Sequence, residues 1–179
     1  MRISGGRVVS LGFFEPQTFC RALEAFQPTW YYAAPTMHML VVRELQERLA
    51  DAQQRKPRLS LRFVANAAGP LPPTVAAEMR TLYTSLHRGG LTTGVMPSYG
   101  MTECMPISSP LPDNDLTPVG TSGRPCGPQV RILAPDGTEC ERGVVGEITL
   151  KGAPLMRGYE LTDGRAADGA PSDAPRGLT

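Results

Sequence analysis

The sequence predicts an α/β fold in which a parallel sheet, joined by crossover helices, is followed by a small antiparallel, barrel-like β subdomain and a disordered tail. In the first part, short apolar segments alternate with longer segments that carry apolar residues at helical spacing. That order favours right-handed crossovers and a parallel sheet. After Pro106, apolar residues recur with a period of two, which is typical of antiparallel strands. We therefore predict an α/β subdomain at residues 1–107, a β-rich subdomain at 108–159 and the tail at 160–179.

The elements of the α/β subdomain follow one another in regular order. Strands are predicted at residues 5–11, 30–33, 61–64 and 94–96. Helices are predicted at 15–26, at 35–50 and from Pro72 onward, because apolar residues fall on one face and proline is tolerated in a first turn. The last strand stops at Pro97, since proline cannot donate to a sheet ladder. We expect His38, a lone histidine on the second helix, to serve packing rather than catalysis.

The β-rich subdomain shows shorter signals. Strands are predicted at residues 129–134 and 144–151, with a Pro-Asp-Gly turn at 135–137. The glycine-rich segment at 120–125 favours a structural turn over a phosphate-binding loop, because it lacks a following Lys-Gly pair. Residues 161–179 are rich in Asp, Gly, Ala and Pro and have no apolar periodicity, so they predict disorder.

Composition argues against several classes of protein. The chain has 179 residues and a net charge of +1 with dispersed Lys and Arg, so we expect no nucleic-acid partner. Its four cysteines form no close-spaced pair, which disfavours a structural zinc site and fits a reducing compartment. No signal peptide or transmembrane segment is recognised. These observations predict a soluble cytoplasmic protein.

The residues that carry chemistry cluster just after the strand at 94–96. Tyr99 can offer a flat face to a base, and Gly100 allows a ligand to approach the backbone. Thr102 can donate to a phosphate oxygen, and Glu103 can hold a magnesium ion shared with that phosphate. Such a set fits a nucleotide at the carboxyl end of an α/β sheet. A Ser-Tyr-Gly turn with a solvated Glu explains the same residues equally well.

A second loop follows the preceding strand. Residues 66–71 are mostly small, and both loops leave carboxyl ends of predicted parallel strands. If those strands are neighbours, the loops form two walls of one pocket.

Three segments, in order, resemble motifs of the adenylate-forming superfamily, which comprises acyl-CoA synthetases, nonribosomal adenylation domains and luciferases. Tyr-Gly-Met-Thr-Glu at 99–103 resembles the core motif, and Ala-Ala-Gly-Pro-Leu-Pro-Pro at 67–73 resembles the loop beside the adenine. The third comprises residues 120–125, 146–148 and 158–159, which resemble the segment that follows the core motif. The likeness covers roughly residues 5–159.

The resemblance implies roles for particular residues. Tyr99 would stack on the adenine, Thr102 would contact the α-phosphate, and Glu103 would hold Mg²⁺. The catalytic residues are thus predicted as Thr102 and Glu103, and the nucleotide-binding residues as Ala67, Ala68, Gly69, Pro70, Ser98, Tyr99, Gly100, Met101 and Thr102. The implied cofactors are ATP or AMP, Mg²⁺, and coenzyme A or a carrier-protein phosphopantetheine arm as acyl acceptor. A carboxylic acid is the implied substrate.

The chain also departs from the family pattern. Pro97 stands where many relatives have an amide side chain that reads the adenine edge. No counterpart is recognised for the phosphate loop with its lysine, for the Thr-Gly-Asp that grips the ribose, or for the C-terminal domain with its catalytic lysine. We therefore expect a fragment of an acyl-CoA-synthetase-like ligase, inactive without the missing N- and C-terminal portions. An adenylation-domain piece of a nonribosomal-type enzyme and a non-catalytic nucleotide-binding or interaction module stay open as alternatives.

Overall fold

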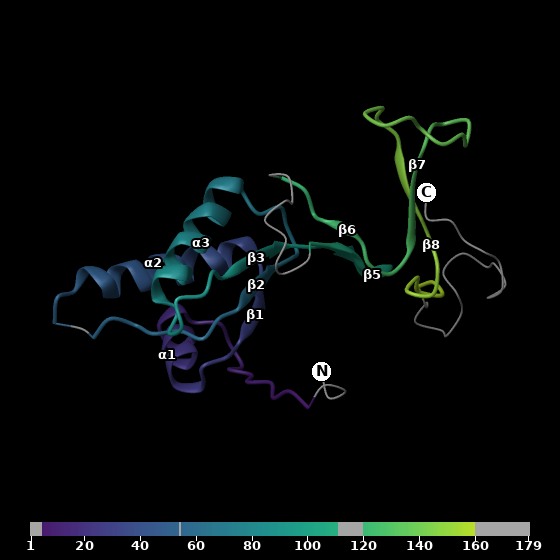
Figure 1. Ribbon diagram of the computed structural model, residues 1–179. Helices are drawn as coiled ribbons and strands as arrows, with labels where there is room; N and C mark the ends of the chain where they lie inside the picture. Colours follow the sequence, from purple (N-terminus) through teal and green to yellow (C-terminus); the bar gives the residue numbers. More distant parts are fainter. Residues whose placement is uncertain (1–4, 54, 111–119, 160–179) are drawn as a thin grey trace. The chain divides into compact units, whose positions relative to one another are not determined.

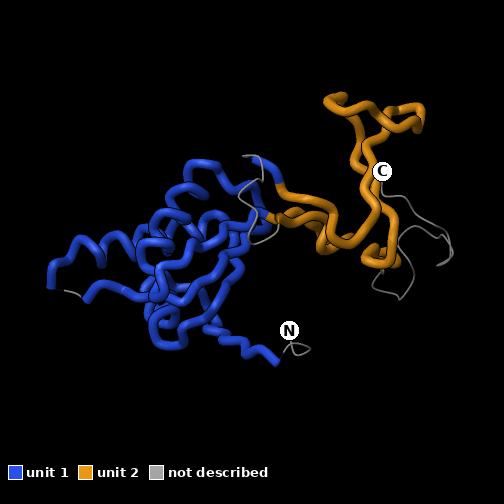
Figure 2. The backbone as a smooth tube through the Cα atoms, viewed as in Figure 1, with its two compact units in different colours: residues 1–97, 111–121 blue, residues 98–110, 122–179 orange. Residues whose placement is uncertain are grey.

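A computed structural model describes residues 5–53, 55–110 and 120–159 (Figure 1), and the chain divides into two compact units. Unit 1 comprises residues 1–97 and 111–121, and unit 2 comprises residues 98–110 and 122–179 (Figure 2). The predicted disordered tail lies outside the described residues, and the predicted subdomain boundary near residue 107 stays a prediction.

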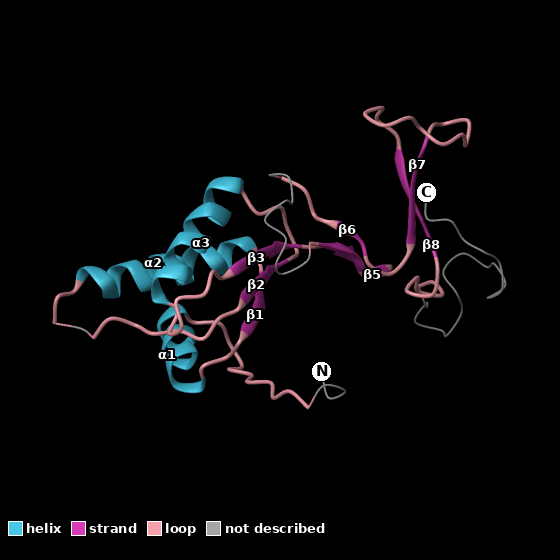
Figure 3. Ribbon diagram, viewed as in Figure 1, coloured by secondary structure: helices cyan, strands magenta, loops and turns pink. Residues whose placement is uncertain are grey.

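Unit 1 holds three helices and a parallel sheet among its described residues (Figure 3). Along the chain these are α1 (Pro16–Phe26), β1 (Trp30–Ala33), α2 (Pro35–Ala50), β2 (Phe63–Asn66), α3 (Pro73–Leu86) and β3 (Gly94–Pro97). The sheet has the order β1-β2-β3 and both pairings are parallel. The helix–strand alternation read from the sequence is therefore confirmed.

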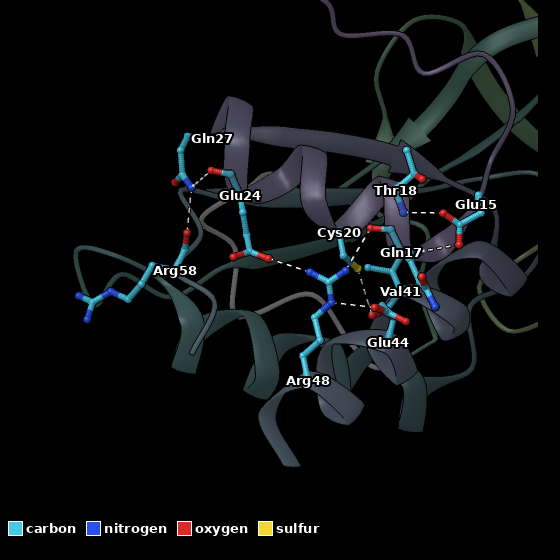
Figure 4. Close-up of polar contacts among 10 residues, drawn as sticks. All are labelled: Glu15, Gln17, Thr18, Cys20, Glu24, Gln27, Val41, Glu44, Arg48 and Arg58. Atoms are coloured by element: carbon cyan, nitrogen blue, oxygen red, sulfur yellow. Dashed lines mark hydrogen bonds and ion pairs between the residues drawn. The ribbon is translucent and has the colours of Figure 1, made fainter. Parts of the chain in front are cut away.

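Each helix begins at a proline, for a simple chemical reason. The first backbone N–H groups of a helix have no intrahelical acceptor, so a residue without an N–H costs nothing there. In α1 the remaining orphan donors are satisfied by the Glu15 carboxylate, which accepts from the backbone N–H groups of Gln17 at 2.9 Å and Thr18 at 2.6 Å (Figure 4).

The core of unit 1 lies between the helices and the sheet. Its fully or almost fully buried members include Val41, Leu45, Val64, Met79 and Tyr83. Beside it, Arg48 of α2 joins the two neighbouring helices by donating to Glu44 of α2 at 2.7 Å and to Glu24 of α1 at 2.9 Å (Figure 4). Apolar burial and this ion-paired contact together fix α1 against α2.

Unit 2 consists of antiparallel strands. A three-stranded sheet contains β4 (Tyr99–Met101), β5 (Cys104–Ser109) and β6 (Arg124–Pro125), and a hairpin pairs β7 (Gln129–Leu133) with β8 (Glu147–Lys151). The described strands do not close into a barrel, so the barrel-like arrangement stays a prediction.

Three details of the predicted strands were wrong. Residues 6–11 form no strand, because no described strand pairs with them. The strand predicted at 61–64 begins two residues later, at Phe63, where its ladder to β1 and β3 starts. The last predicted strand likewise begins at Glu147 rather than at residue 144, since its register with β7 starts there.

Two further observations bear on the predicted class of protein. All four cysteines, Cys20, Cys104, Cys126 and Cys140, are free thiols. Among the residues that the structure describes, no helix combines the length and the apolar character needed to cross a bilayer.

Candidate functional site

The small-residue loop predicted to border a nucleotide follows β2 directly. Asn66, the last residue of β2, is buried, and its side-chain amide donates to the backbone carbonyl of Gly69 at 2.9 Å. The backbone N–H of Ala67 donates to the carbonyl of Ala33 in β1 at 3.1 Å. A β-carbon at Gly69 would stand 3.6 Å from the ring of Pro35, the first residue of α2. The loop is therefore held to β1, β2 and the start of α2.

The backbone of this loop contains an unusual conformation. Ala68 has a φ of 65°, in the left-handed region that residues with a β-carbon disfavour by about 1 kcal/mol or more. The side chain of Ala68 is exposed, whereas Ala67 is only 9% exposed. Strained backbone of this kind is enriched at ligand-binding loops.

Register brings the ends of β2 and β3 to the same level. Asn66 is paired with Pro97, so the loop at 67–70 and the segment that begins at Ser98 leave the sheet from adjacent strands. The neighbouring strands that the sequence analysis required are thus observed. The segment that begins at Ser98 belongs to unit 2, and the pocket predicted between the two loops stays a prediction.

In unit 2 the core motif forms a hairpin rather than the loop that the sequence suggested. Tyr99 pairs with Ser108 and Met101 pairs with Cys104, which leaves Thr102 and Glu103 in the turn between β4 and β5. Thr102 is exposed and Glu103 is half-buried, so both side chains are accessible to a ligand. Tyr99 as a whole residue is 37% exposed.

The turn is held by a segment more than fifty residues further along the chain. The Tyr159 hydroxyl donates to Oε1 of Glu103 at 2.5 Å, and the backbone N–H of Met156 donates to the carbonyl of Glu103 at 2.8 Å. Leu155 also bridges to Cys104 in antiparallel fashion. Two of the segments singled out in the sequence, 99–103 and 158–159, therefore meet inside unit 2.

Tyr159 also changes the electrostatics of the turn. Its hydroxyl stabilises the ionised carboxylate of Glu103 and so lowers the pKa of that group. The same hydrogen bond raises the pKa of Tyr159. Sequence reasoning gave Tyr159 no role at the acid, because nothing local indicates which acceptor its hydroxyl reaches.

Glu103 is chemically suited to magnesium. Mg²⁺ is commonly held by one or two carboxylates together with substrate phosphates and water, rather than by a full protein cage. Glu103 is ionised and accessible, and in the part of the chain that the structure describes no three His, Cys, Asp or Glu side chains form a metal-binding group. A site of one carboxylate plus phosphate oxygens therefore fits the residues present.

The glycine-rich segment at 120–125 contains a position that only glycine can fill. Gly123 has a φ of 86°, and a β-carbon there would lie 2.1 Å from the carbonyl carbon of Ser109. The close approach places Arg124 and Pro125 in β6 beside β5. This geometry supports the structural turn that the sequence analysis favoured.

His38 is fully buried, in keeping with the packing role predicted for it. Its Nδ1 lies 3.1 Å from the Tyr31 hydroxyl, which in turn lies 2.6 Å from the hydroxyl of Tyr83. Burial lowers the pKa of His38 to about 4, with the backbone of Ala65 and Ala33 partly opposing that shift. The imidazole is therefore neutral near pH 7 and belongs to a polar chain inside the core.

The chain is similar in sequence to AMP-binding enzymes and to CoA ligases. The model of the family described as AMP-binding enzyme matches residues 1–160. A probable CoA ligase of Humulus lupulus is 28% identical over 162 residues, which cover 88% of this chain and 28% of that protein. This chain thus spans less than a third of the length of the curated relatives that it matches.

Solved structures show the same arrangement of elements. A long-chain-fatty-acid-CoA ligase from Archaeoglobus fulgidus has a TM-score of 0.70 at 20% identity, over 86% of this chain and 33% of that one. O-succinylbenzoate coenzyme A synthetase from Bacillus subtilis, solved in complex with AMP, has a TM-score of 0.61 at 26% identity. That match covers 82% of this chain and 27% of the synthetase.

Proposed function

The chain belongs to the AMP-binding enzyme family, and on that premise we propose that it forms part of an ATP-dependent acid–thiol ligase. Such an enzyme activates a carboxylic acid as an acyl-adenylate, releases pyrophosphate, and passes the acyl group to a thiol. We favour coenzyme A over a carrier-protein arm as the acceptor, because the relative from Humulus lupulus is named a probable CoA ligase.

The observation that carries this proposal is the presentation of Thr102 and Glu103. Both stand in the tight turn between β4 and β5, where neighbouring strands fix the backbone and the side chains stay accessible. The hydrogen bond from the Tyr159 hydroxyl lowers the pKa of the Glu103 carboxylate. A turn that displays one hydroxyl and one anion is suited to a phosphate and its counter-ion.

Each candidate residue has a defined task in the proposed reaction. The Thr102 hydroxyl donates to an α-phosphate oxygen of ATP while the carboxylate of the substrate acid attacks the α-phosphorus. Contacts of this kind typically contribute two to three orders of magnitude in rate. Glu103 would hold Mg²⁺, which when bound offsets negative charge on the phosphates. The ring of Tyr99 offers a face to the adenine, with Ser98, Gly100 and Met101 supplying the adjoining backbone.

The loop in unit 1 would complete the nucleotide site. Ala67, Ala68, Gly69 and Pro70 have small or rigid side chains that leave the backbone open to a ligand. We propose that this loop borders the adenine and the acyl group. An apolar wall there would position the acid and keep water from the mixed anhydride.

Pyrophosphate exchange tests the catalytic part of the proposal. The 179-residue chain is incubated with ATP, labelled pyrophosphate, Mg²⁺ and a panel of carboxylic acids. We expect no exchange, because the phosphate loop and catalytic lysine of the family have no recognised counterpart in this sequence. Robust exchange with any acid would contradict the expectation that this chain is only part of the catalytic machinery.

AMP binding tests the site itself. We expect calorimetry to detect AMP binding, and Tyr99→Ala to weaken it by about 1 to 3 kcal/mol, the usual contribution of base stacking. Tyr32→Ala is the matched control, since Tyr32 is also exposed and lies on β1 of unit 1. Absence of AMP binding, or an equal loss in the two variants, would remove Tyr99 from the proposed site.

A further inference from the structure

A pocket of about 400 Å³ in unit 1 is lined by Arg55, Lys56, Arg58 and Arg88, which we call the basic pocket. Arg55, Lys56 and Arg58 lie in the connector between α2 and β2, and Arg88 lies just after α3. In the sequence, the Lys and Arg residues are dispersed along the chain. Folding brings four of them to one hollow.

Backbone hydrogen bonds fix the two segments that form this pocket. Leu59 and His87 make a parallel bridge. The backbone N–H of Leu59 donates to the carbonyl of Leu86 at 2.8 Å, and the backbone N–H of Arg88 donates to the carbonyl of Leu59 at 2.8 Å. Arg58 adds a side-chain bond, from Nη2 to the carbonyl of Arg88 at 3.3 Å. The lining residues therefore lie beside a short backbone hydrogen-bonded ladder that joins the two segments.

A side chain from α1 supports the same segment. The amide nitrogen of Gln27 donates to the carbonyl of Arg58 at 2.9 Å, and the Gln27 oxygen accepts from the Ser60 hydroxyl at 2.7 Å. Figure 4 shows the Arg58 guanidinium extending away from Gln27. The backbone is thus anchored, and the Arg58 guanidinium keeps further N–H donors besides the one bonded to the carbonyl of Arg88.

The charge of the basic pocket is not balanced within the described part of the chain. None of its four cations forms an ion pair with a described carboxylate, whereas Arg43, Arg48 and Arg131 each pair with a glutamate. Like charges gathered in a hollow repel one another and raise the local positive potential. A bound anion would relieve that repulsion.

Charge and volume together define the kind of anion. Pockets for small molecules usually enclose about 300 to 1,000 Å³, so this one has room for more than a single simple ion. Guanidinium groups match phosphate oxygens through paired N–H donors, and lysine adds a point charge. A ligand that carries several phosphates satisfies four cations better than a monocarboxylate does.

We propose that the basic pocket binds a small polyphosphate-bearing ligand. The pocket precedes β2 and β3, whereas the loop at 67–70 follows β2, so the two features lie at opposite ends of the parallel strands. The site is therefore separate from the proposed adenylate loop of unit 1. The inference does not depend on the proposed function.

Calorimetry with sodium triphosphate tests the proposal, using the whole 179-residue chain at low and at physiological salt. We expect one triphosphate per chain, with affinity that falls as salt screens the charges. The variant Arg55→Gln/Arg58→Gln/Arg88→Gln should bind at least about tenfold more weakly. The matched control, Arg7→Gln/Arg80→Gln/Arg142→Gln, removes the same charge from exposed positions outside the pocket and should change affinity less than about threefold.

Parallel titrations identify the source of the phosphates. If ATP or coenzyme A competes with triphosphate for the site, the ligand is a nucleotide. If neither binds there while triphosphate still does, the ligand is the inorganic ion. The Tyr99→Ala variant should bind triphosphate like the wild type, which separates this site from the proposed adenylate site. Failure of all three ligands to bind at low salt, binding of polyglutamate in their place, or an equal loss in the control variant would overturn the proposal.

Discussion

The two units of the chain differ in how much apolar surface each one encloses. In unit 1, helices and a parallel sheet surround a continuous core that includes Leu45, Met79 and Tyr83. In unit 2, the buried apolar cluster is limited to Cys104, Ile107 and Leu150 among the described residues, and Val144, Val145 and Ile148 are exposed. Short antiparallel pairings with little apolar cover are marginally stable by themselves.

The difference bears directly on the candidate site, because its residues are divided between the units. The loop at 67–70 rests on the core of unit 1, through Asn66 and the carbonyl of Ala33. Thr102 and Glu103 depend on hairpin pairing and on Tyr159. We infer that the loop in unit 1 rests on a stable core, whereas the order of Thr102 and Glu103 in unit 2 depends on a few local contacts.

Truncation of a core side chain should give the largest contrast between the units. Leu45 is completely buried in unit 1, so Leu45→Ala should lower the free energy of unfolding by about 2 to 5 kcal/mol through lost burial and a residual cavity. Ile148, at 45% exposure in unit 2, offers the matched control, and Ile148→Ala should cost less than about 1 kcal/mol. Urea denaturation measures both values. Similar costs at the two positions would mean that unit 2 is as well packed as unit 1.

Acid should weaken unit 1 through His38. Its folded-state pKa of about 4 lies below the ordinary value of 6.5, because burial disfavours the charged ring. The unfolded chain therefore binds the proton more readily, and the stabilisation present above about pH 6.5 is lost as the pH falls toward 4. At about 1.4 kcal/mol per pKa unit, the loss approaches 3 kcal/mol.

The pH effect is isolated by comparing variants in unfolding experiments at pH 7 and pH 5. His38→Gln should lose less stability over this interval than the wild type. Tyr83→Phe is the control and should retain the wild-type slope, because it removes a hydroxyl of the same buried polar chain but no group that titrates between pH 5 and pH 7. An unchanged slope in His38→Gln would show that another group causes the acid sensitivity.

How far the sequence predicted the structure also differs between the units. The predicted helix at 35–50 agrees with α2, because an apolar stripe and a proline at the first turn are local signals. The same holds for α1, apart from one residue. Strand limits were less accurate, since the start of β2 is set by its neighbours rather than by its own apolar residues.

In unit 2 the signals were weaker for physical reasons. β4 has three residues, too few for a period-two pattern, and the side chains of Tyr99 and Thr102 suggested a ligand loop. The contact between Tyr159 and Glu103 joins residues 56 positions apart, and no local pattern specifies such a pairing. The candidate residues were identified by resemblance to family motifs, whereas their support by Tyr159 required the structure.

A smaller effect should distinguish the ion pairs of the two units. Arg48 is only 14% exposed and donates to Glu44, Glu24 and the carbonyl of Gln17, so Arg48→Met should cost about 1 to 2 kcal/mol (Figure 4). Arg43 of the same helix pairs with Glu47 at 77% exposure, and Arg43→Met should cost at most about 0.5 kcal/mol. Arg131, whose partner Glu139 in unit 2 lies 3.8 Å away, should behave like Arg43. Thermal melts measure the three variants, and equal costs would contradict the special role given to Arg48.

The smallest predicted change concerns backbone strain in the loop at 67–70. Unit 2 uses glycine at its tight left-handed position, Gly123, whereas unit 1 places Ala68 at a φ of 65°. Ala68→Gly should therefore stabilise the chain by about 0.5 to 1 kcal/mol, since removal of the β-carbon relieves more strain than the added freedom of the unfolded chain costs. Ala67→Gly, at a position without a positive φ, should instead destabilise by about 0.5 to 1 kcal/mol. Urea unfolding measures the change in the free energy of unfolding for each variant, which should have opposite signs. A loss of stability in both variants would show that the backbone at Ala68 is not strained.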